Sequence, residues 1–110
     1  MAGRVNVTIG GKLFTCLRLE KADFSDIAAV YAVISVARDG SWSVLDVGQS
    51  KELGERIDGH DRKECWQRNC NNGDIWVCIY PMPSSRYSKY DRLQFEEYLR
   101  QGNSPPCAKM

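Results

Sequence analysis

The segment VLDVGQSKELGERIDGH, residues 44–60, contains the change from strand to helix on which the fold of this chain depends. It begins with apolar residues typical of a β-strand, and Gly48 stands at the junction. Beyond the junction, Ser50 is a residue type that often caps a helix N-terminus. Leu53 and Ile57 then have the four-residue spacing of an apolar helix face. The segment therefore predicts a strand, a tight turn and a helix.

The same predicted helix carries two polar side chains suited to phosphate chemistry. Arg56 and His60 are four residues apart, so we expect them on one side of the helix. The planar guanidinium group suits phosphate oxygens, and the imidazole group has its ordinary pKa near neutrality. Considered singly, the arginine reads more simply as a surface charge and the histidine as an exposed helix residue.

Two hairpins are predicted before and around this segment. Residues 5–19 alternate between apolar and polar and are interrupted by two adjacent glycines, a hairpin signal. Residues 29–36 are apolar on both faces, as in a central covered strand. An Asp-Gly pair then precedes residues 42–48, which we expect to return as the second strand of a second hairpin. Residues 20–29 between the hairpins are expected to form a loop or a short helix.

The C-terminal half predicts one more strand and one more helix. Residues 61–74 read as a polar loop that holds one tryptophan. Residues 75–82 form an apolar run ended by prolines, and residues 84–102 read as a long helix that begins at serines and stops at Gly102. The order hairpin, hairpin, helix, strand, helix predicts an α+β domain with a mostly antiparallel central sheet flanked by helices.

The composition limits the classes of protein that this chain can belong to. Its 110 residues are the size of one domain, and 43% hydrophobic and 26% charged residues are typical of a globular protein. No run of eighteen apolar residues is present, and the first ten residues lack the apolar core of a signal peptide. We therefore expect a cytoplasmic protein without a membrane partner. The net charge of +1 means that any basic nucleic-acid surface must be local.

The cysteine pattern supports an intracellular location. There are five cysteines without regular spacing, and an odd number argues against a disulfide scaffold. Cys78 lies within an apolar run and reads as a core residue. A zinc site built from His60, Cys65 and Cys70 is an alternative, but its spacing is loose and a fourth ligand is not evident.

Four pieces of the sequence resemble the signature of the GIY-YIG nuclease family, in the order in which that family has them. AVY at residues 29–31 matches the first tripeptide of the family, and DVG at residues 46–48 matches the second. Arg56 and His60 match the Arg and the His or Tyr of the following helix. Glu96 matches the metal-binding glutamate of the late helix.

The resemblance implies a small GIY-YIG-like domain. It extends over most of the chain, with residues 29–107 as the core. Residues 1–28 are then an extra N-terminal β-hairpin, and residues 1–110 form a single domain.

The resemblance also implies a divalent-metal-dependent endonuclease that hydrolyses DNA phosphodiester bonds. Tyr31 would take part in activating the water, and Arg56 would stabilise the phosphoryl charge. His60 would orient groups or shuttle a proton, and Glu96 would hold one cation. A single carboxylate suits Mg²⁺ or Mn²⁺, which keep most of their waters. The residues expected to contact the substrate are Gly48, Gln49 and Ser50.

Asp46 departs from the family, which has a tyrosine at this position. We include it among the catalytic residues, because a carboxylate can serve as a base or as an additional metal ligand. Without a metal it would repel the phosphate, by about 4 kcal/mol for unit charges 4 Å apart at an effective dielectric of 20. The expectation is either tighter metal binding or an impaired site.

A second hypothesis is a catalytically silent nucleic-acid-binding or protein-interaction module on the same fold. The partner would be nucleic acid, with DNA as the first candidate. Because acidic and basic residues are matched over residues 51–68, binding should be weak, which favours a homodimer or a protein partner. Tyr31 then reads as a core residue, and Arg92 with Glu96 as an ordinary helix ion pair. Two tryptophans, Trp66 and Trp76, are candidates for base stacking or for the core.

Overall fold

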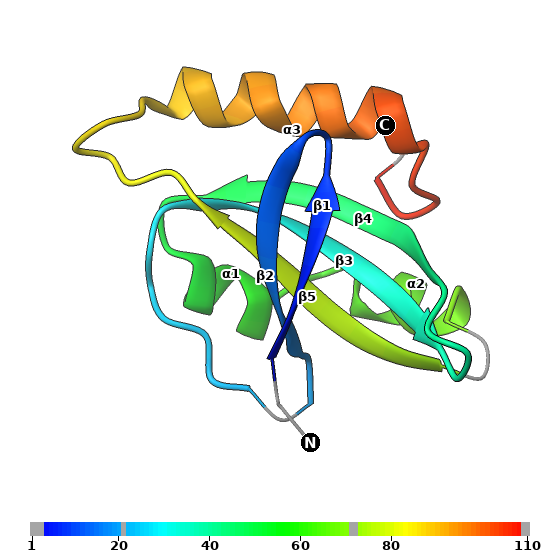
Figure 1. The fold of residues 1–110 in the computed structure, drawn as a ribbon. Helices are drawn as coiled ribbons and strands as arrows, with labels where there is room; N and C mark the ends of the chain where they lie inside the picture. The colour runs from blue at the N-terminus through cyan, green and yellow to red at the C-terminus, as the bar shows by residue number, and fades with distance from the viewer. Residues whose placement is uncertain (1–3, 21, 71–72, 109–110) are drawn as a thin grey trace.

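The first hairpin forms one side of the sheet. The computed structural model describes residues 4–20, 22–70 and 73–108. In it, β1 (Arg4–Ile9) pairs antiparallel with β2 (Lys12–Arg18), as the two glycines predict (Figure 1). Gly10 has a φ of 58° and Gly11 a φ of 82°. Glycine adopts this left-handed conformation without steric cost, so the pair permits the tight turn.

The second hairpin and one later strand complete a five-stranded antiparallel sheet. β3 (Ala29–Ala37) pairs with β4 (Trp42–Ser50) through a turn at Gly40, and β3 also pairs with β5 (Gly73–Pro81). The strand order is β1-β2-β5-β3-β4. The predicted α+β class and antiparallel sheet are confirmed. The N-terminal hairpin is continuous with the rest of the sheet, because β2 pairs with β5.

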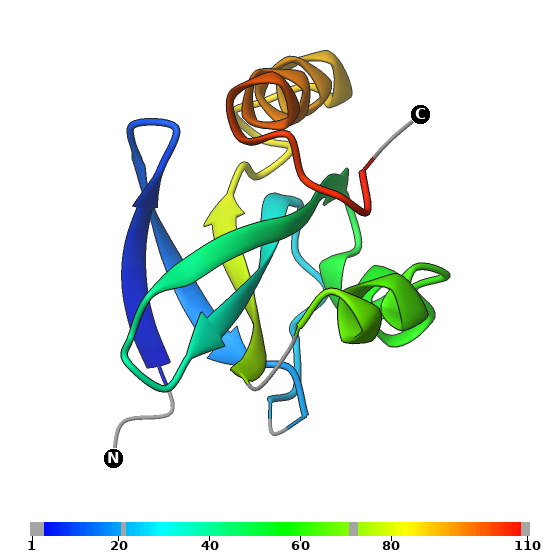
Figure 2. The ribbon, with the colours of Figure 1, turned by 90° about the vertical axis from the view of Figure 1, so that its right-hand side faces the viewer.

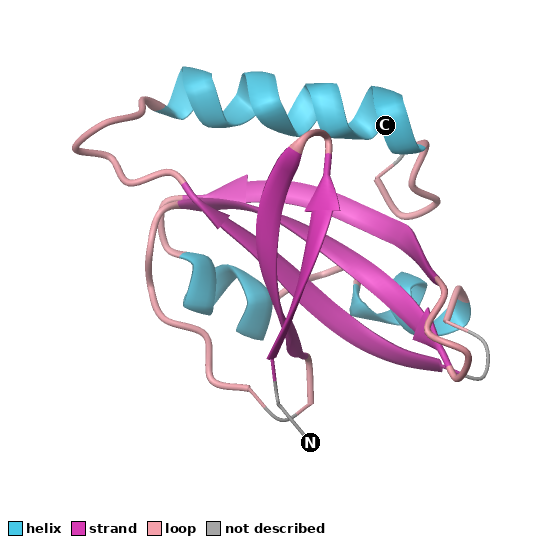
Figure 3. Cartoon of the chain, in the orientation of Figure 1, coloured by secondary structure: helices cyan, strands magenta, loops and turns pink. Residues whose placement is uncertain are grey.

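Helices cover both faces of the sheet. α3 (Lys89–Asn103) lies across one face, and α1 (Leu53–Asp58) and α2 (Lys63–Arg68) lie on the other (Figures 1 and 2). Figure 3 shows the same division by element type, with long loops leading into β3 and α3. In the described part of the chain, none of these helices has the length and apolar character needed to cross a membrane.

The alternation of side chains along β3 divides the core into two layers. Ala29, Tyr31 and Val33 pack in the layer that includes residues of α1 and α2. Their even-numbered neighbours, Val30, Ala32 and Ile34, pack in the layer that includes Leu99 of α3. The parity of Tyr31 therefore places it beneath α1 and α2.

A β-bulge in β4 changes which of its residues share a face. Val33 is paired with Asp46, but Ile34 is paired with Val44, so Leu45 is the extra residue. As a result both Leu45 and Asp46 face α1 and α2, while Val44 and Val47 pack on the α3 side. Asp46 and Gly48 keep the regular alternation opposite Val33 and Tyr31, so Asp46 lies in the layer that contains Tyr31, and the bulge adds Leu45 to that layer.

The helices differ from the prediction in two places. α1 ends at Asp58, so Arg56 is helical but His60 lies beyond the helix, after Gly59; the expected shared helix side is wrong. Ser50 ends β4, and Glu52 is the N-cap. Residues 61–74 are not simply a loop, because α2 forms there around the fully buried Trp66.

The long helix predicted over residues 84–102 is confirmed as α3, but it begins five residues later, at Lys89, and ends one residue later, at Asn103. Ser88 caps it, and its hydroxyl accepts a bond from the Asp91 backbone while the Asp91 carboxylate accepts one from the Ser88 backbone. This reciprocal capping box stabilises the first turn. The helix continues through Gly102, where the sequence predicted its end, and Ser104, with a φ of 46°, is the C-cap.

Two disulfides contradict the expectation from the cysteine count. Cys16 and Cys78 face each other across β2 and β5 and are bonded, so Cys78 is not simply a core thiol. Cys65 of α2 is bonded to Cys107 of the C-terminal segment. The odd number leaves Cys70, the one free cysteine among the described residues. An odd number of cysteines excludes the pairing of all five, but it is compatible with two disulfides and one free thiol.

Candidate functional site

A hydrogen-bonded pair of Tyr31 and His60 is at the centre of the candidate site. The Tyr31 hydroxyl lies 2.7 Å from Nε2 of His60, and both side chains are buried. Gly48 is directly opposite Tyr31 in the β3–β4 register. A methyl group at Gly48 would overlap the phenol ring and hydroxyl, so the ring occupies the space that a side chain would need. Gly48 thus permits the position of Tyr31.

The second ring nitrogen of His60 identifies its tautomer. The backbone N–H of Arg62 donates to Nδ1 over 3.1 Å, so Nδ1 must be unprotonated. In the neutral ring the proton is then on Nε2, which donates to the Tyr31 oxygen. Burial first, and then the positive charges of Arg56 and Arg62, lower the pKa of His60 to about 4. The imidazole is therefore neutral at pH 7.

Burial is also the largest influence on the pKa of Tyr31. It raises the pKa of the phenol to about 12, although the neighbouring guanidinium of Arg56 opposes it by charge and hydrogen bonding. Arg62 opposes it as well, whereas Asp46 adds to the rise. At neutral pH the phenol is protonated, and its phenolate form gains stability from the two arginines.

Asp46 is fully buried, and its carboxylate accepts hydrogen bonds from three donors. Oδ1 accepts from the Val47 backbone at 2.8 Å. Oδ2 accepts from Nε of Arg62 at 2.8 Å and from the indole N–H of Trp66 at 2.7 Å. Burial raises the pKa of Asp46, while the bonds from Arg62 and Trp66 lower it. The sequence-based picture of an uncompensated charge facing phosphate is therefore wrong, because Arg62 pairs with it.

Arg56 and Ser50 line a shallow hollow of about 330 Å³ beside this cluster. The other lining residues are Lys51, Glu52, Glu55 and Gly59. The Arg56 side chain is 36% exposed, and its Nη1 is 3.5 Å from the Asp61 carboxylate. The Ser50 hydroxyl accepts a bond from the Glu52 backbone. Arg56 thus lies between the buried Tyr31 and open surface.

Gln49 points to the other face of the sheet. Its Oε1 accepts a bond from Nε of Arg92 over 3.2 Å, and Arg92 is a buried residue of α3 that also donates to the Met82 carbonyl. The structure therefore does not bring Gln49 together with Tyr31 and Gly48. The predicted ion pair between Arg92 and Glu96 is not formed, because the Arg92 guanidinium contacts Gln49 and Met82.

Glu96 is paired with Arg100 one helical turn later. Nη2 of Arg100 donates to its Oε2 over 2.8 Å. Burial raises the pKa of Glu96; the charge of Arg100 opposes this first, then that of Arg62, while Asp46 adds to the rise. Glu96 belongs to α3, which covers the face of the sheet opposite α1 and α2 (Figure 2), and its contact among the described residues is with Arg100. In the described residues no group of three His, Cys, Asp or Glu side chains is placed to hold a metal.

The other sequence alternatives find little support. Cys65 is in a disulfide, so a zinc site with His60 and Cys70 would require it to be broken. Trp66 and Trp76 are both buried and are core residues. Sequence reasoning missed Arg62 as a site residue and the role of Trp66. A tryptophan in an otherwise polar segment was the available signal for the second.

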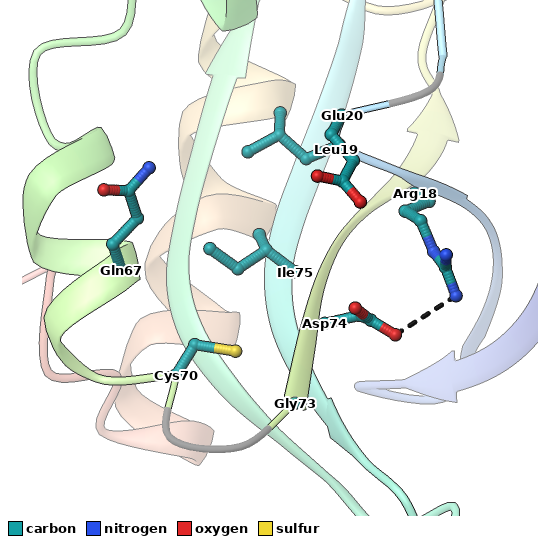
Figure 4. Close-up of a pocket in the computed structure, with 8 residues that line it drawn as sticks. All are labelled: Arg18, Leu19, Glu20, Gln67, Cys70, Gly73, Asp74 and Ile75. Atoms are coloured by element: carbon teal, nitrogen blue, oxygen red, sulfur yellow. Dashed lines mark hydrogen bonds and ion pairs between the residues drawn. The ribbon is translucent and has the colours of Figure 1, made fainter.

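A separate hollow of about 270 Å³ contains none of the predicted site residues. Figure 4 shows it at the start of β5, next to the Arg18–Asp74 ion pair and the Cys70 thiol. The candidate site is therefore the Tyr31 cluster and not this hollow. Compared with known proteins, the chain matches no family model, and neither a curated protein nor a solved structure is similar to it.

Proposed function

We propose that this protein is a divalent-metal-dependent endonuclease of the GIY-YIG type that hydrolyses DNA phosphodiester bonds. The observation that carries the proposal is the Tyr31–His60 hydrogen bond of 2.7 Å beneath two arginines. These residues come from separate segments of the chain. The resemblance assigned Tyr31, Arg56 and His60 to one phosphate-processing site, and their proximity supports that assignment.

The chain's own residues divide the work of hydrolysis. Tyr31 in its phenolate form takes a proton from water as the water oxygen attacks phosphorus. The Nε2–H group of His60 donates a hydrogen bond to the phenolate oxygen and keeps its proton. This hydrogen bond holds the Tyr31 ring in place. Arg56 meets the negative charge on the phosphoryl oxygens. The bond from phosphorus to the leaving oxygen breaks, and that oxygen takes a proton from solvent.

Mg²⁺ or Mn²⁺ is the proposed cofactor, with Glu96 as its protein ligand. Arg100 contacts Oε2, so Oε1 remains for a cation among the contacts of the described residues. One carboxylate fits an ion that keeps its waters and takes other ligands from the substrate. When bound, the ion would supply positive charge to the phosphate group. Asp46 is a poor second ligand, because it is fully buried and its Oδ2 already accepts two hydrogen bonds.

The complete burial of Tyr31 favours a second candidate function. Its side chain is 0% exposed, so water reaches the phenol only if the surface residues move. The pKa of about 12 also leaves little phenolate at pH 7. A catalytically silent nucleic-acid-binding or protein-interaction module on the same fold would keep this cluster as part of its core.

The decisive experiment is cleavage of single-stranded, duplex and branched DNA with Mg²⁺ or Mn²⁺, compared with EDTA. Tyr31→Phe should abolish metal-dependent cleavage while binding persists. Arg56→Ala should lower turnover by about 10²–10³-fold with a smaller effect on affinity, because its charge acts mainly in the transition state. Arg86→Ala is the matched control, since Arg86 is exposed and lies in the loop before α3. DNA binding without cleavage by the parent protein would favour the silent module.

A further inference from the structure

We propose that Arg62 is a second phosphate-contacting cation of this site and that Asp46 and Trp66 are the positioning residues that aim it. The proposal rests on the proposed function only for the location of the substrate. Its ligand is the phosphodiester backbone of nucleic acid.

Hydrogen bonds from Trp66 and Val47 hold the Asp46 carboxylate in one orientation. Asp46 pairs with Val33 on the face of the sheet that α2 covers, and there the Trp66 indole donates to Oδ2. Trp66 is fully buried and its ring lies 4.5 Å from that of His60, so it is fixed by packing. The Val47 backbone fixes the other oxygen. A carboxylate with these bonds has one orientation.

Arg62 is anchored to this carboxylate through one nitrogen of its guanidinium group. Nε of Arg62 donates to Asp46, and no other hydrogen bond from its side chain occurs among the described residues. Its two terminal nitrogens are therefore available, and the side chain is 35% exposed. A guanidinium group that is anchored through Nε presents its terminal N–H groups as a fork suited to phosphate oxygens.

The Arg62 guanidinium group lies at the partly exposed edge of the Tyr31–His60 cluster. Arg62 lies close enough to Tyr31, His60 and Glu96 to affect the pKa of each. Its backbone N–H holds Nδ1 of His60. The backbone of Arg62 therefore fixes the tautomer of His60, while its side chain places a positive charge at the surface next to the same histidine. In this proposal Arg56, which lines the neighbouring hollow, and Arg62 are the two positive groups that contact one phosphate.

The test is binding of a fluorescent single-stranded oligothymidylate in EDTA over a range of salt concentrations. Arg62→Lys is the main variant, because its ammonium group can still pair with the buried Asp46 carboxylate but has no second group to extend to phosphate. We expect about tenfold weaker binding, the effect of losing one hydrogen bond to a charged group. The salt slope should fall by about 0.7, the loss of one phosphate contact. Arg68→Lys should leave both unchanged, because Arg68 is exposed at the far end of α2, the helix for which Arg62 is the N-cap.

Asp46→Asn tests the positioning role. If the carboxylate aims Arg62, this variant binds more weakly than the parent, and the difference disappears in the Arg62→Lys background. A merely structural role of Asp46 would persist in that background. If Asp46→Asn instead binds more tightly, its charge repels the substrate and the proposal is overturned. Thermal unfolding of each variant confirms that it is folded.

The outcomes separate this inference from the proposed function. Arg62-dependent binding without metal-dependent cleavage would keep the inference and remove the nuclease. Cleavage and binding that Arg62→Lys leaves unchanged would keep the nuclease and remove the inference. No binding of the oligonucleotide by the parent protein would also refute the contact.

Discussion

Tyr31 and His60 are separated by 29 residues in sequence, yet their side chains meet through a buried hydrogen bond of 2.7 Å. His60 is the only histidine in the chain, so its titration can be observed without ambiguity.

We predict that His60 titrates with a pKa of about 4, below its ordinary value of 6.5. A lowered pKa in the folded state means that the unfolded chain binds the proton more readily, so stability falls as the pH decreases from 6.5 to 4. The cost is about 1.4 kcal/mol for each pKa unit. NMR of the imidazole should show the Nε2–H tautomer at pH 7, and His60→Gln should remove this part of the pH dependence. A pKa near 6.5 would show that the ring is not buried as described.

Gly48→Ala should destabilise the protein by about 1–3 kcal/mol, because the added methyl group overlaps the Tyr31 ring in a packed layer. Gly102→Ala is the matched control. Nothing lies within 4 Å of the methyl group added there, and Gly102 is in α3. The free energy of unfolding of that variant should rise by up to about 1 kcal/mol, because alanine has a higher helix propensity than glycine. Chemical denaturation measures both, and equal effects of the two substitutions would contradict the close approach of Tyr31 to Gly48.

Cleavage should accelerate as the pH rises. The proposed base is the phenolate of Tyr31, whose pKa is about 12. Because the phenolate fraction below this pKa grows about tenfold per pH unit, the logarithm of the rate should rise with a slope near one between pH 7 and 10. Single-turnover cleavage in Mg²⁺ measures the slope. A rate independent of pH over this range would exclude Tyr31 as the base.

The native protein should contain one reactive thiol, that of Cys70, and five after unfolding and reduction. The two disulfides account for the difference. Disulfides persist in oxidising compartments, whereas the cytoplasm keeps thiols reduced, so the thiol count also tests the cytoplasmic location expected from the sequence. Removal of Cys65 and Cys107 together by serine should cost about 2–4 kcal/mol of stability. Five thiols in the native protein would contradict both disulfides.

The sequence by itself determined those features that depend on local chemistry. Adjacent glycines predicted the first hairpin, Asp39 with Gly40 predicted the second, and the two-faced apolar run of residues 29–36 predicted the covered strand β3. Serines before a long amphipathic stretch predicted α3. These signals lie within a few residues of the structure that they specify, and short-range backbone geometry is sufficient to produce it.

Only the tertiary structure decided how the site is assembled. Strict alternation along β4 would place Leu45 and Asp46 on opposite faces, and the bulge places both on one. α2 forms because Trp66 is buried against the sheet. The position of α2 then brings the Trp66 indole and the Arg62 side chain to Asp46. Bulges and long-range side-chain contacts depend on the packing of segments that are far apart in the chain, and no local pattern encodes them. The charge of Asp46, read from the sequence as unpaired, is paired for that reason.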